Sequence, residues 1–321
     1  MLHSTAHTLL LVGVIGLAGC AARSRPVASA PRDAAAPTAT APEGSLGDYI
    51  EKIRHLSAAV RPLSAANGVV TLESRDPELA AALLRLRTEP GVSAHLAIGE
   101  HYRVRGVLDS AHKHFTAAVK IDAGNADAYE GLAKTWRDWG VAGVALGDAA
   151  RARFYAPRAA SVQNTLGTIL QALGRADDAR IAYESALALE PRATYAMNNL
   201  CYLSFLEGRM DLAVAQCQRA VALEPALKVA RYNLALAHAG AGRMDLAAES
   251  LAAGGDVAEA SFNLGILHLA QRDYRRAASA FDAASRARPT FNLARERARQ
   301  ARVLMHASTG TGAVQDDGDE K

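Results

Sequence analysis

The strongest constraint on the fold of this chain is a set of residues that returns every 34 positions. The set comprises a leucine, a glycine, two alanines and a proline. Two consecutive copies are Leu166, Gly174, Ala179, Ala186 and Pro191, followed by Leu200, Gly208, Ala213, Ala220 and Pro225. A fixed period of this length is typical of repeat proteins, in which each copy is one small unit that buries its apolar face against its neighbours.

Each recurring residue type has a physical reason within a helix–turn–helix unit. Glycine at position 15 of a unit allows the left-handed backbone that ends a first helix. Proline at position 32 stops a second helix. Alanine at positions 20 and 27 allows the two helices to approach closely. An aromatic ring at position 24, as in Phe115, Tyr183 and Phe281, fills the space between them.

This pattern resembles the tetratricopeptide repeat. The resemblance implies an all-α fold, a right-handed superhelical solenoid with helical caps and a concave inner groove. We place six units over residues 92–291, the fifth being four residues short near Gly254 and Gly255. Their bounds are 92–125, 126–159, 160–193, 194–227, 228–257 and 258–291.

The segments that flank the repeats predict caps. Residues 45–91 are expected to form an N-terminal helical cap or, alternatively, a degenerate repeat, with a helix that starts at Asp76-Pro77 and runs to about Arg87. Apolar residues at helical spacing predict a capping helix over residues 292–306. Residues 307–321 are predicted to be a disordered acidic tail.

The N-terminus predicts a secreted chain. Leu9 to Ala18 form an apolar run that is too short to span a bilayer, which takes about 20 residues. The run ends in Leu17-Ala18-Gly19-Cys20, which resembles the lipoprotein box of bacteria. The resemblance implies a signal peptide over 1–19, lipidation of Cys20 and an anchor in the cell envelope, at the outer membrane facing the periplasm. An ordinary secretory signal is the alternative. Residues 20–44 are predicted to be a disordered, Ala/Pro-rich tether.

Composition and motifs argue against several function classes. With 36 basic and 33 acidic residues the net charge is only +3, which gives little support to nucleic-acid binding. The sequence lacks the short motifs of common enzyme and nucleotide-binding sites. We therefore expect no catalytic residues, no cofactor and no small-molecule substrate. His95, His101, His112 and His114 lack ligand spacing, so no metal site is predicted and they are expected at the surface.

Cys201 and Cys217 occupy positions 8 and 24 of the fourth unit, on opposite helices. They form a disulfide in an oxidising compartment if their Cα atoms approach within about 7 Å. The alternative is a pair of small buried apolar side chains.

A binding site is predicted in the groove, at the inner positions of the first helices of units four to six. These positions carry mostly aromatic and aliphatic side chains. They are Tyr195, Asn198, Tyr202, Phe205, Val229, Tyr232, Leu236, Phe262, Ile266 and Leu269. Such a patch favours a peptide or helix of a protein partner. The alternative is that the C-terminal cap covers part of it. The second unit carries charges at these positions instead, namely Asp127, Glu130, Lys134, Arg137 and Asp138.

Residues 272–302 hold nine arginines against Asp273, Asp282 and Glu296. This segment is interpreted either as a solvated helix surface or as a contact for anionic lipid or an acidic partner.

The segment Ala230 to Ala237, followed by Gly242-Arg243, is similar to segments of tight-adherence (Flp) pilus assembly lipoproteins. Secretin-pilot lipoproteins of type IV pili have a similar anchor and similar repeats. The resemblance implies a non-enzymatic scaffold whose partners are pilus, secretin or secretion-system subunits. The alternative is an adaptor lipoprotein that recruits a peptidoglycan hydrolase or a periplasmic protease.

Overall fold

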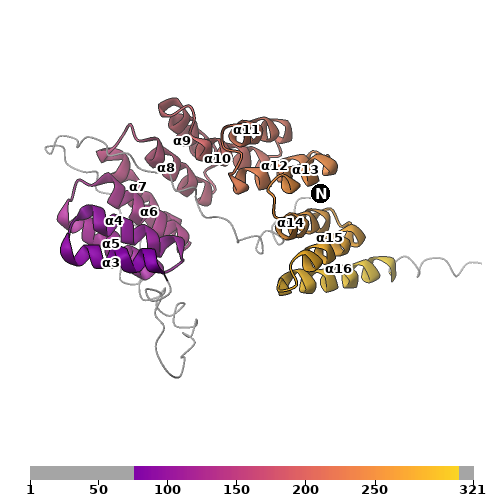
Figure 1. Cartoon of the computed structure of the whole chain (residues 1–321). Coiled ribbons are helices and arrows are strands. Elements are labelled where there is room, and N and C mark those ends of the chain that lie inside the picture. The colour runs from indigo at the N-terminus through magenta and orange to yellow at the C-terminus, as the bar shows by residue number, and fades with distance from the viewer. Residues whose placement is uncertain (1–75, 311–321) are drawn as a thin grey trace, which may run out of the picture. The chain divides into compact units, whose positions relative to one another are not determined.

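The computed structural model describes residues 76–310, and the prediction of an all-α fold is confirmed for them (Figure 1). The helices are α3 (Pro77–Thr88), α4 (Val92–Val104), α5 (Leu108–Ile121), α6 (Ala126–Asp138), α7 (Ala142–Tyr155), α8 (Ala160–Ala172), α9 (Ala176–Leu189), α10 (Thr194–Leu206), α11 (Met210–Leu223), α12 (Lys228–Gly240), α13 (Met244–Ala252), α14 (Val257–Ala270), α15 (Tyr274–Ala287) and α16 (Asn292–Gly310). The signal peptide, the tether, most of the N-terminal cap and residues 311–321 of the acidic tail lie outside the described residues. Residues 307–310, predicted to belong to the disordered tail, instead continue helix α16.

The helices pack in pairs along the chain. Each even-numbered helix from α4 to α14 packs against the helix that follows it, and α16 packs on α15. The first helices from α4 to α12 begin 34 residues apart, at Val92, Ala126, Ala160, Thr194 and Lys228. The fold is therefore a solenoid of helical hairpins. The hairpin of α12 and α13 has a second helix of nine residues, where α11 has 14.

The predicted roles of alanine and glycine are confirmed. Alanine at position 20 of all six units is fully buried, as is alanine at position 27 of five units. They are Ala111, Ala145, Ala179, Ala213, Ala247 and Ala277, and Ala118, Ala152, Ala186, Ala220 and Ala284. Five units have glycine at position 15 with φ between 74° and 79°, for example Gly174. In the sixth unit Arg272 takes this place with a φ of 60°.

In three units a glycine at position 8 faces an aromatic ring at position 24. The pairs are Gly99 with Phe115, Gly167 with Tyr183, and Gly265 with Phe281. A Cβ atom added to these glycines would lie 2.9, 2.5 and 2.6 Å from the ring, respectively. The absence of a side chain therefore lets the ring press against the backbone of the first helix.

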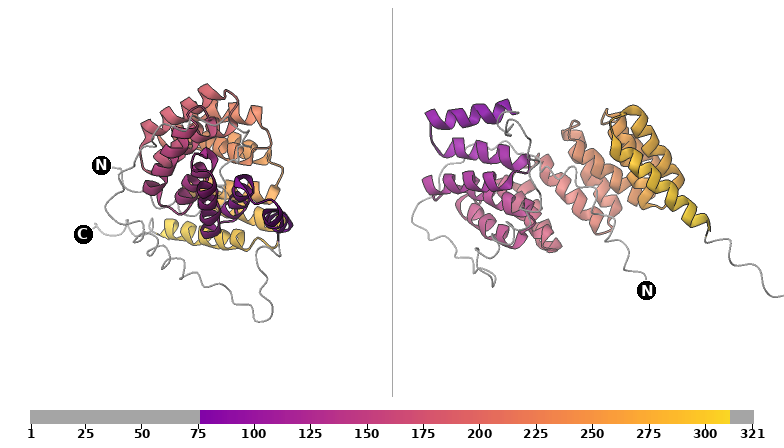
Figure 2. Two further views of the ribbon diagram at one scale, coloured as in Figure 1. Left: turned by 90° about the vertical axis from the view of Figure 1, so that its left-hand side faces the viewer. Right: turned by 90° about the horizontal axis from the view of Figure 1, so that it is seen from below.

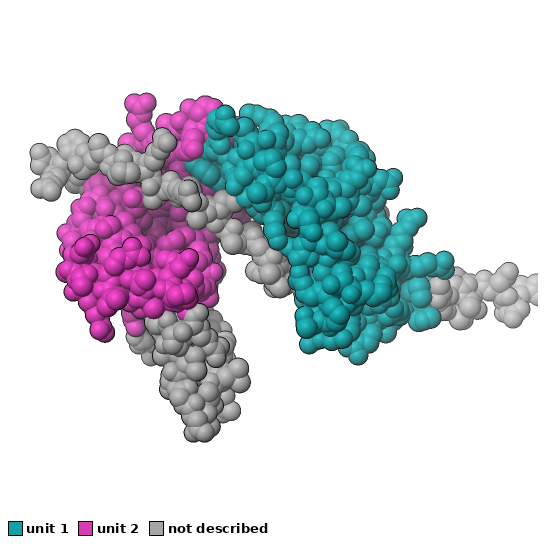
Figure 3. All heavy atoms as spheres, in the orientation of Figure 1, with its two compact units in different colours: residues 1–21, 192–321 teal, residues 22–191 magenta. Residues whose placement is uncertain are grey.

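The chain divides into two compact units, between the third and fourth repeats (Figure 3). The described part of the N-terminal unit is residues 76–191, from α3 to α9. The described part of the C-terminal unit is residues 192–310, from α10 to α16. At the start of α3 the Asp76 side chain accepts hydrogen bonds from the amides of Glu78 and Leu79, and Pro77 opens the helix as predicted.

Candidate functional site

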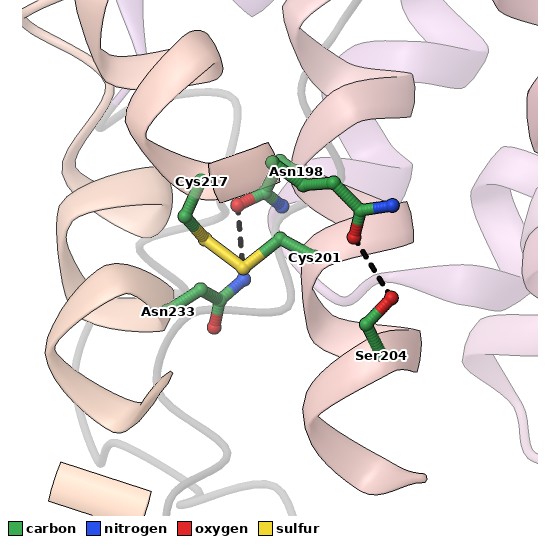
Figure 4. The surroundings of a disulfide bond; sticks show 6 residues. Asn198, Cys201, Ser204, Cys217 and Asn233 are labelled. Atoms are coloured by element: carbon green, nitrogen blue, oxygen red, sulfur yellow. Dashed lines mark hydrogen bonds between the residues drawn. A yellow bond between two sulfur atoms is a disulfide. The ribbon is translucent and has the colours of Figure 1, made fainter. Parts of the chain in front are cut away.

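A disulfide joins the two helices of the fourth repeat. Cys201 of α10 and Cys217 of α11 are bonded, with their Cα atoms 5.3 Å apart (Figure 4). Both residues are fully buried, in a cluster that includes Leu234 of α12. Of the two alternatives left open by the sequence, the structure has the bonded one. The pair occupies positions 8 and 24, where the glycine and the ring meet in three other repeats.

Five of the residues predicted to line the groove form a half-buried patch on α10 and α12, which pack beside each other. We call it the α10–α12 patch. Its members are Tyr202, Phe205, Val229, Tyr232 and Leu236. The rings of Tyr202 and Phe205 stack with centroids 6.3 Å apart. Burial raises the pKa of both tyrosines, and for Tyr232 the nearby Tyr202 adds to this rise. The two phenols therefore lie in partly buried positions on adjacent first helices.

Two further residues of the predicted groove are buried. Tyr195 is only 9 % exposed and Asn198 only 5 %. The Asn198 Oδ1 atom accepts a hydrogen bond of 2.9 Å from the Nδ2 atom of Asn233 on the next first helix (Figure 4). This bond joins neighbouring repeats and satisfies buried polar groups, so Asn198 holds α10 to α12.

The remaining three residues of the predicted groove are partly buried and contact the C-terminal helices. Phe262, Ile266 and Leu269 of α14 lie against a buried cluster from α15 and α16 that includes Phe281 and Ala298. The Phe262 ring also lies 4.8 Å, between centroids, from the ring just before α16, that of Phe291. These three side chains are only partly buried, so the prediction that the patch continues onto α14 stays a prediction, and the C-terminal helices contact this part of it.

The first helices of the N-terminal unit carry a polar network instead of an apolar patch. The buried guanidinium of Arg103 on α4 binds Glu100 on its own helix at 2.7 Å and Asp138 on α6 at 2.5 Å. Arg137 in turn donates a hydrogen bond of 2.8 Å to Thr168 of α8. Three consecutive first helices are thereby connected through charged or polar side chains.

Glu130 is the most buried carboxylate of this network. It pairs with Lys134 at 2.7 Å and accepts hydrogen bonds from Thr165 and Ser161 of α8, at 2.7 and 3.1 Å. Burial raises the pKa of Glu130, but Lys134 and the two hydroxyls outweigh this effect and hold the pKa below its usual value. These charges bind one another, so the predicted charged surface serves mainly to hold repeats together.

The sequence did not single out Arg103 or Thr165, although the period contained a signal for them. Arg103–Asp138, Glu130–Thr165 and Asn198–Asn233 are each 35 residues apart. One position of a first helix therefore contacts the following position in the next repeat. Searching the sequence for polar residues 35 positions apart would therefore have predicted these contacts.

The histidines of the first repeat are not simply at the surface, contrary to expectation. The Nδ1 atoms of His95 and His114 lie 3.0 Å apart and link α4 to α5, and the His114 ring stacks on Tyr102. His112 meets the edge of Trp136, with centroids 5.0 Å apart. Within residues 76–310, no group of three His, Cys, Asp or Glu side chains is placed to hold a metal ion.

The relation of the chain to a membrane was predicted from its N-terminus. None of the helices in the described part of the chain has the length and apolar character needed to cross a bilayer. Cys20, the predicted lipidation site, lies outside the described residues.

The sequence profile of the tetratricopeptide repeat matches residues 164–227, 249–291 and 262–314. These hairpins are tetratricopeptide repeats. Such repeats form protein–protein interaction scaffolds and are typically non-catalytic, and the profile matches them at residues 164–227 and 249–314 of this chain. No curated protein matches the chain in sequence.

Several solved structures share the fold. A chain of the Cut9–Hcn1 hetero-tetramer of the APC/C is 18 % identical, with a TM-score of 0.57 over 71 % of this chain and 46 % of its own. This chain therefore spans less than half of that protein. A tetratricopeptide repeat protein of Parabacteroides merdae is 17 % identical, with a TM-score of 0.53 over 79 % of this chain and 98 % of its own. PilF of Pseudomonas aeruginosa is 20 % identical, with a TM-score of 0.50 over 68 % of this chain and 97 % of its own. At these identities the likeness concerns the fold alone.

Proposed function

We propose that this chain is a non-enzymatic scaffold of the bacterial cell envelope that binds a segment of a protein partner on the α10–α12 patch. The observation that carries the proposal is the pair Tyr202 and Tyr232. These two aromatic side chains lie on adjacent first helices, and both are only partly buried. Tyrosine is favoured at protein interfaces because its ring adds apolar contact area while its hydroxyl still reaches a hydrogen-bond partner.

The partner class comes from the sequence. The similarity of residues 230–237 and 242–243 to pilus assembly lipoproteins supports a pilus, secretin or secretion-system subunit. The lipoprotein-like sequence at Cys20 supports a lipid anchor, in the outer membrane and facing the periplasm. An adaptor that recruits a peptidoglycan hydrolase or a protease is the second candidate, and the same anchor and repeats would serve it.

A crosslinking pull-down from native membranes tests the patch. Wild type is compared with Tyr202→Ala/Tyr232→Ala and with the matched control Tyr129→Ala/Tyr155→Ala. The control removes a stacked tyrosine pair from the N-terminal unit, with centroids 5.8 Å apart. We expect one envelope protein to be captured by wild type and control and lost from the patch variant. Equal capture by all three contradicts the patch, and capture of a hydrolase or protease selects the adaptor. Circular dichroism checks that both variants are folded.

Metabolic labelling with palmitate tests the anchor separately. We expect the wild-type chain to take up label and to fractionate with the outer membrane, and Cys20→Ser to do neither. An unlabelled wild-type chain would contradict the anchor without affecting the result for the patch.

A further inference from the structure

We propose that the surface formed by α15 and α16 binds the anionic headgroups of a membrane. The proposal begins with two rows of exposed arginines. On α15, Arg275 and Arg286 are eleven residues apart, which is three helical turns, so they share one side of the helix. On α16, Arg295, Arg299 and Arg302 follow one another at spacings of four and three and also share a side.

An ion pair shows that these two sides adjoin. Asp282 lies seven residues after Arg275 and four before Arg286, on the same side of α15, and it pairs with Arg302 of α16. The two helices pack side by side (Figures 1 and 2). The five arginines and Asp282 therefore form one surface, which we call the arginine strip. Five positive charges against one negative charge leave a net charge of four on it.

Most of this charge is available to a ligand. Arg302 is engaged by Asp282, and Arg295 by Asn292 on its own helix. Among the described residues no carboxylate forms an ion pair with Arg275, Arg286 or Arg299, and all three are exposed. Guanidinium groups bind phosphate oxygens through two parallel hydrogen bonds, so free arginines in a row suit a surface of phosphates.

The chemistry of the strip favours a lipid surface over a polypeptide. Protein interfaces take much of their binding energy from aromatic anchors that fill pockets, whereas the strip offers exposed guanidinium groups. Charge alone is sufficient at an anionic leaflet, where each basic residue near the surface adds to the binding. The proposal rests on the envelope location proposed above, in which an anchor at Cys20 holds the chain next to a membrane.

Vesicle co-sedimentation tests the strip with the full-length chain. All proteins carry Cys20→Ser so that no acyl chain contributes, and phosphatidylcholine vesicles give the baseline. The probe is a vesicle with about 30 % phosphatidylglycerol. The strip variant is Arg275→Gln/Arg286→Gln/Arg299→Gln. The matched control, Arg87→Gln/Arg153→Gln/Arg158→Gln, removes three exposed arginines from the N-terminal unit and the same net charge.

We expect the parent chain to prefer phosphatidylglycerol vesicles and the preference to decline with added salt. The strip variant should lose at least about tenfold in binding to them, and the control less than about twofold. Equal losses in both variants would mean that only net charge matters, which overturns the strip. Absence of a preference for phosphatidylglycerol, or binding to polyglutamate without binding to vesicles, overturns the membrane as its ligand.

The outcome is separable from that of the proposed function. Tyr202→Ala/Tyr232→Ala should bind vesicles as the parent chain does, because the α10–α12 patch shares no residue with the strip. Failure of partner capture in that variant therefore leaves vesicle binding unchanged, and loss of vesicle binding in the strip variant leaves partner capture unchanged.

Discussion

Cys201 and Cys217 are bonded across the fourth repeat at the two positions where a glycine meets an aromatic ring in the first, third and sixth repeats. In those repeats the two helices are held by a ring against bare backbone. In the fourth repeat no ring is present at position 24, and a covalent bond fills the same role. The two solutions should therefore be interchangeable.

The first prediction concerns this exchange. Cys201→Ala/Cys217→Ala should lower the free energy of unfolding of the C-terminal unit by about 3 kcal/mol, the value expected for a loop of this length. Cys201→Gly/Cys217→Phe should recover part of that loss, because it recreates the pair of Gly265 and Phe281. Urea unfolding with and without dithiothreitol measures both effects. The account would be contradicted if dithiothreitol lowered the free energy of unfolding of the Gly/Phe protein. It would also be contradicted if dithiothreitol left that of wild type unchanged.

The second prediction concerns the turn of the sixth repeat. Arg272 has a φ of 60°, where five other repeats have glycine. A left-handed backbone costs a residue with a side chain roughly 1–2 kcal/mol, and glycine avoids this while losing more chain entropy. Arg272→Gly should therefore stabilise the protein by about 0.5–1 kcal/mol. Thermal unfolding measures the change, with Arg275→Gly inside α15 as a control that should destabilise.

The third prediction concerns the buried carboxylate of the N-terminal unit. Glu130→Gln removes the charge that Lys134 faces and weakens two hydrogen bonds from α8. We expect a loss of about 2 kcal/mol, below the range for a fully buried pair because Lys134 is partly exposed. Exposed Glu184→Gln should change stability by less than about 0.5 kcal/mol.

The pH dependence of that loss has a definite sign. The pKa of Glu130 lies below its usual value in the folded state, so its stabilisation is complete at neutral pH and declines as the pH falls. The difference in the free energy of unfolding between wild type and Glu130→Gln should therefore shrink below about pH 4.3, the ordinary pKa of glutamate. A difference that stayed constant down to pH 3 would argue against an ionised Glu130.

The fourth prediction concerns His95 and His114. Burial lowers the pKa of both rings, and for His114 the nearby His95 lowers it further. A histidine with a lowered pKa stabilises the fold at neutral pH, and this stability is lost as the pH falls below the ordinary value of about 6.5. Stability should therefore decrease between pH 7.5 and pH 5.5. In His114→Phe, which keeps a ring beside Tyr102, the decrease should be smaller. An equal loss of stability in both proteins would mean that groups other than His114 cause the pH dependence.

The hairpins themselves were predictable because the residues that define them act locally. Gly174 ends a first helix through its own backbone, and Ala179 is buried because a small side chain lets two neighbouring helices meet. Asp76 and Pro77 start α3 by capping its first amides. Each of these effects operates within one unit, and the 34-residue period repeats the unit.

The candidate site was predicted only in part. Tyr202 and Tyr232 were found because their positions within a repeat place them on first helices. The same rule also included Asn198, which is buried and binds Asn233, and Phe262, which is partly buried and packs against the C-terminal helices. A position in the repeat specifies the side of a helix, but it does not specify what packs on that side.

By itself, the sequence determined the repeat, the pairing of its helices and the places where they end, because short-range packing and backbone preferences set these. Only the tertiary structure decided which residues remain accessible. It packed Phe262 against Phe281 and Phe291, joined Arg103 to Asp138 and bonded Cys201 to Cys217. These outcomes depend on the distance between side chains of different helices, and that distance is fixed only when whole helices pack together.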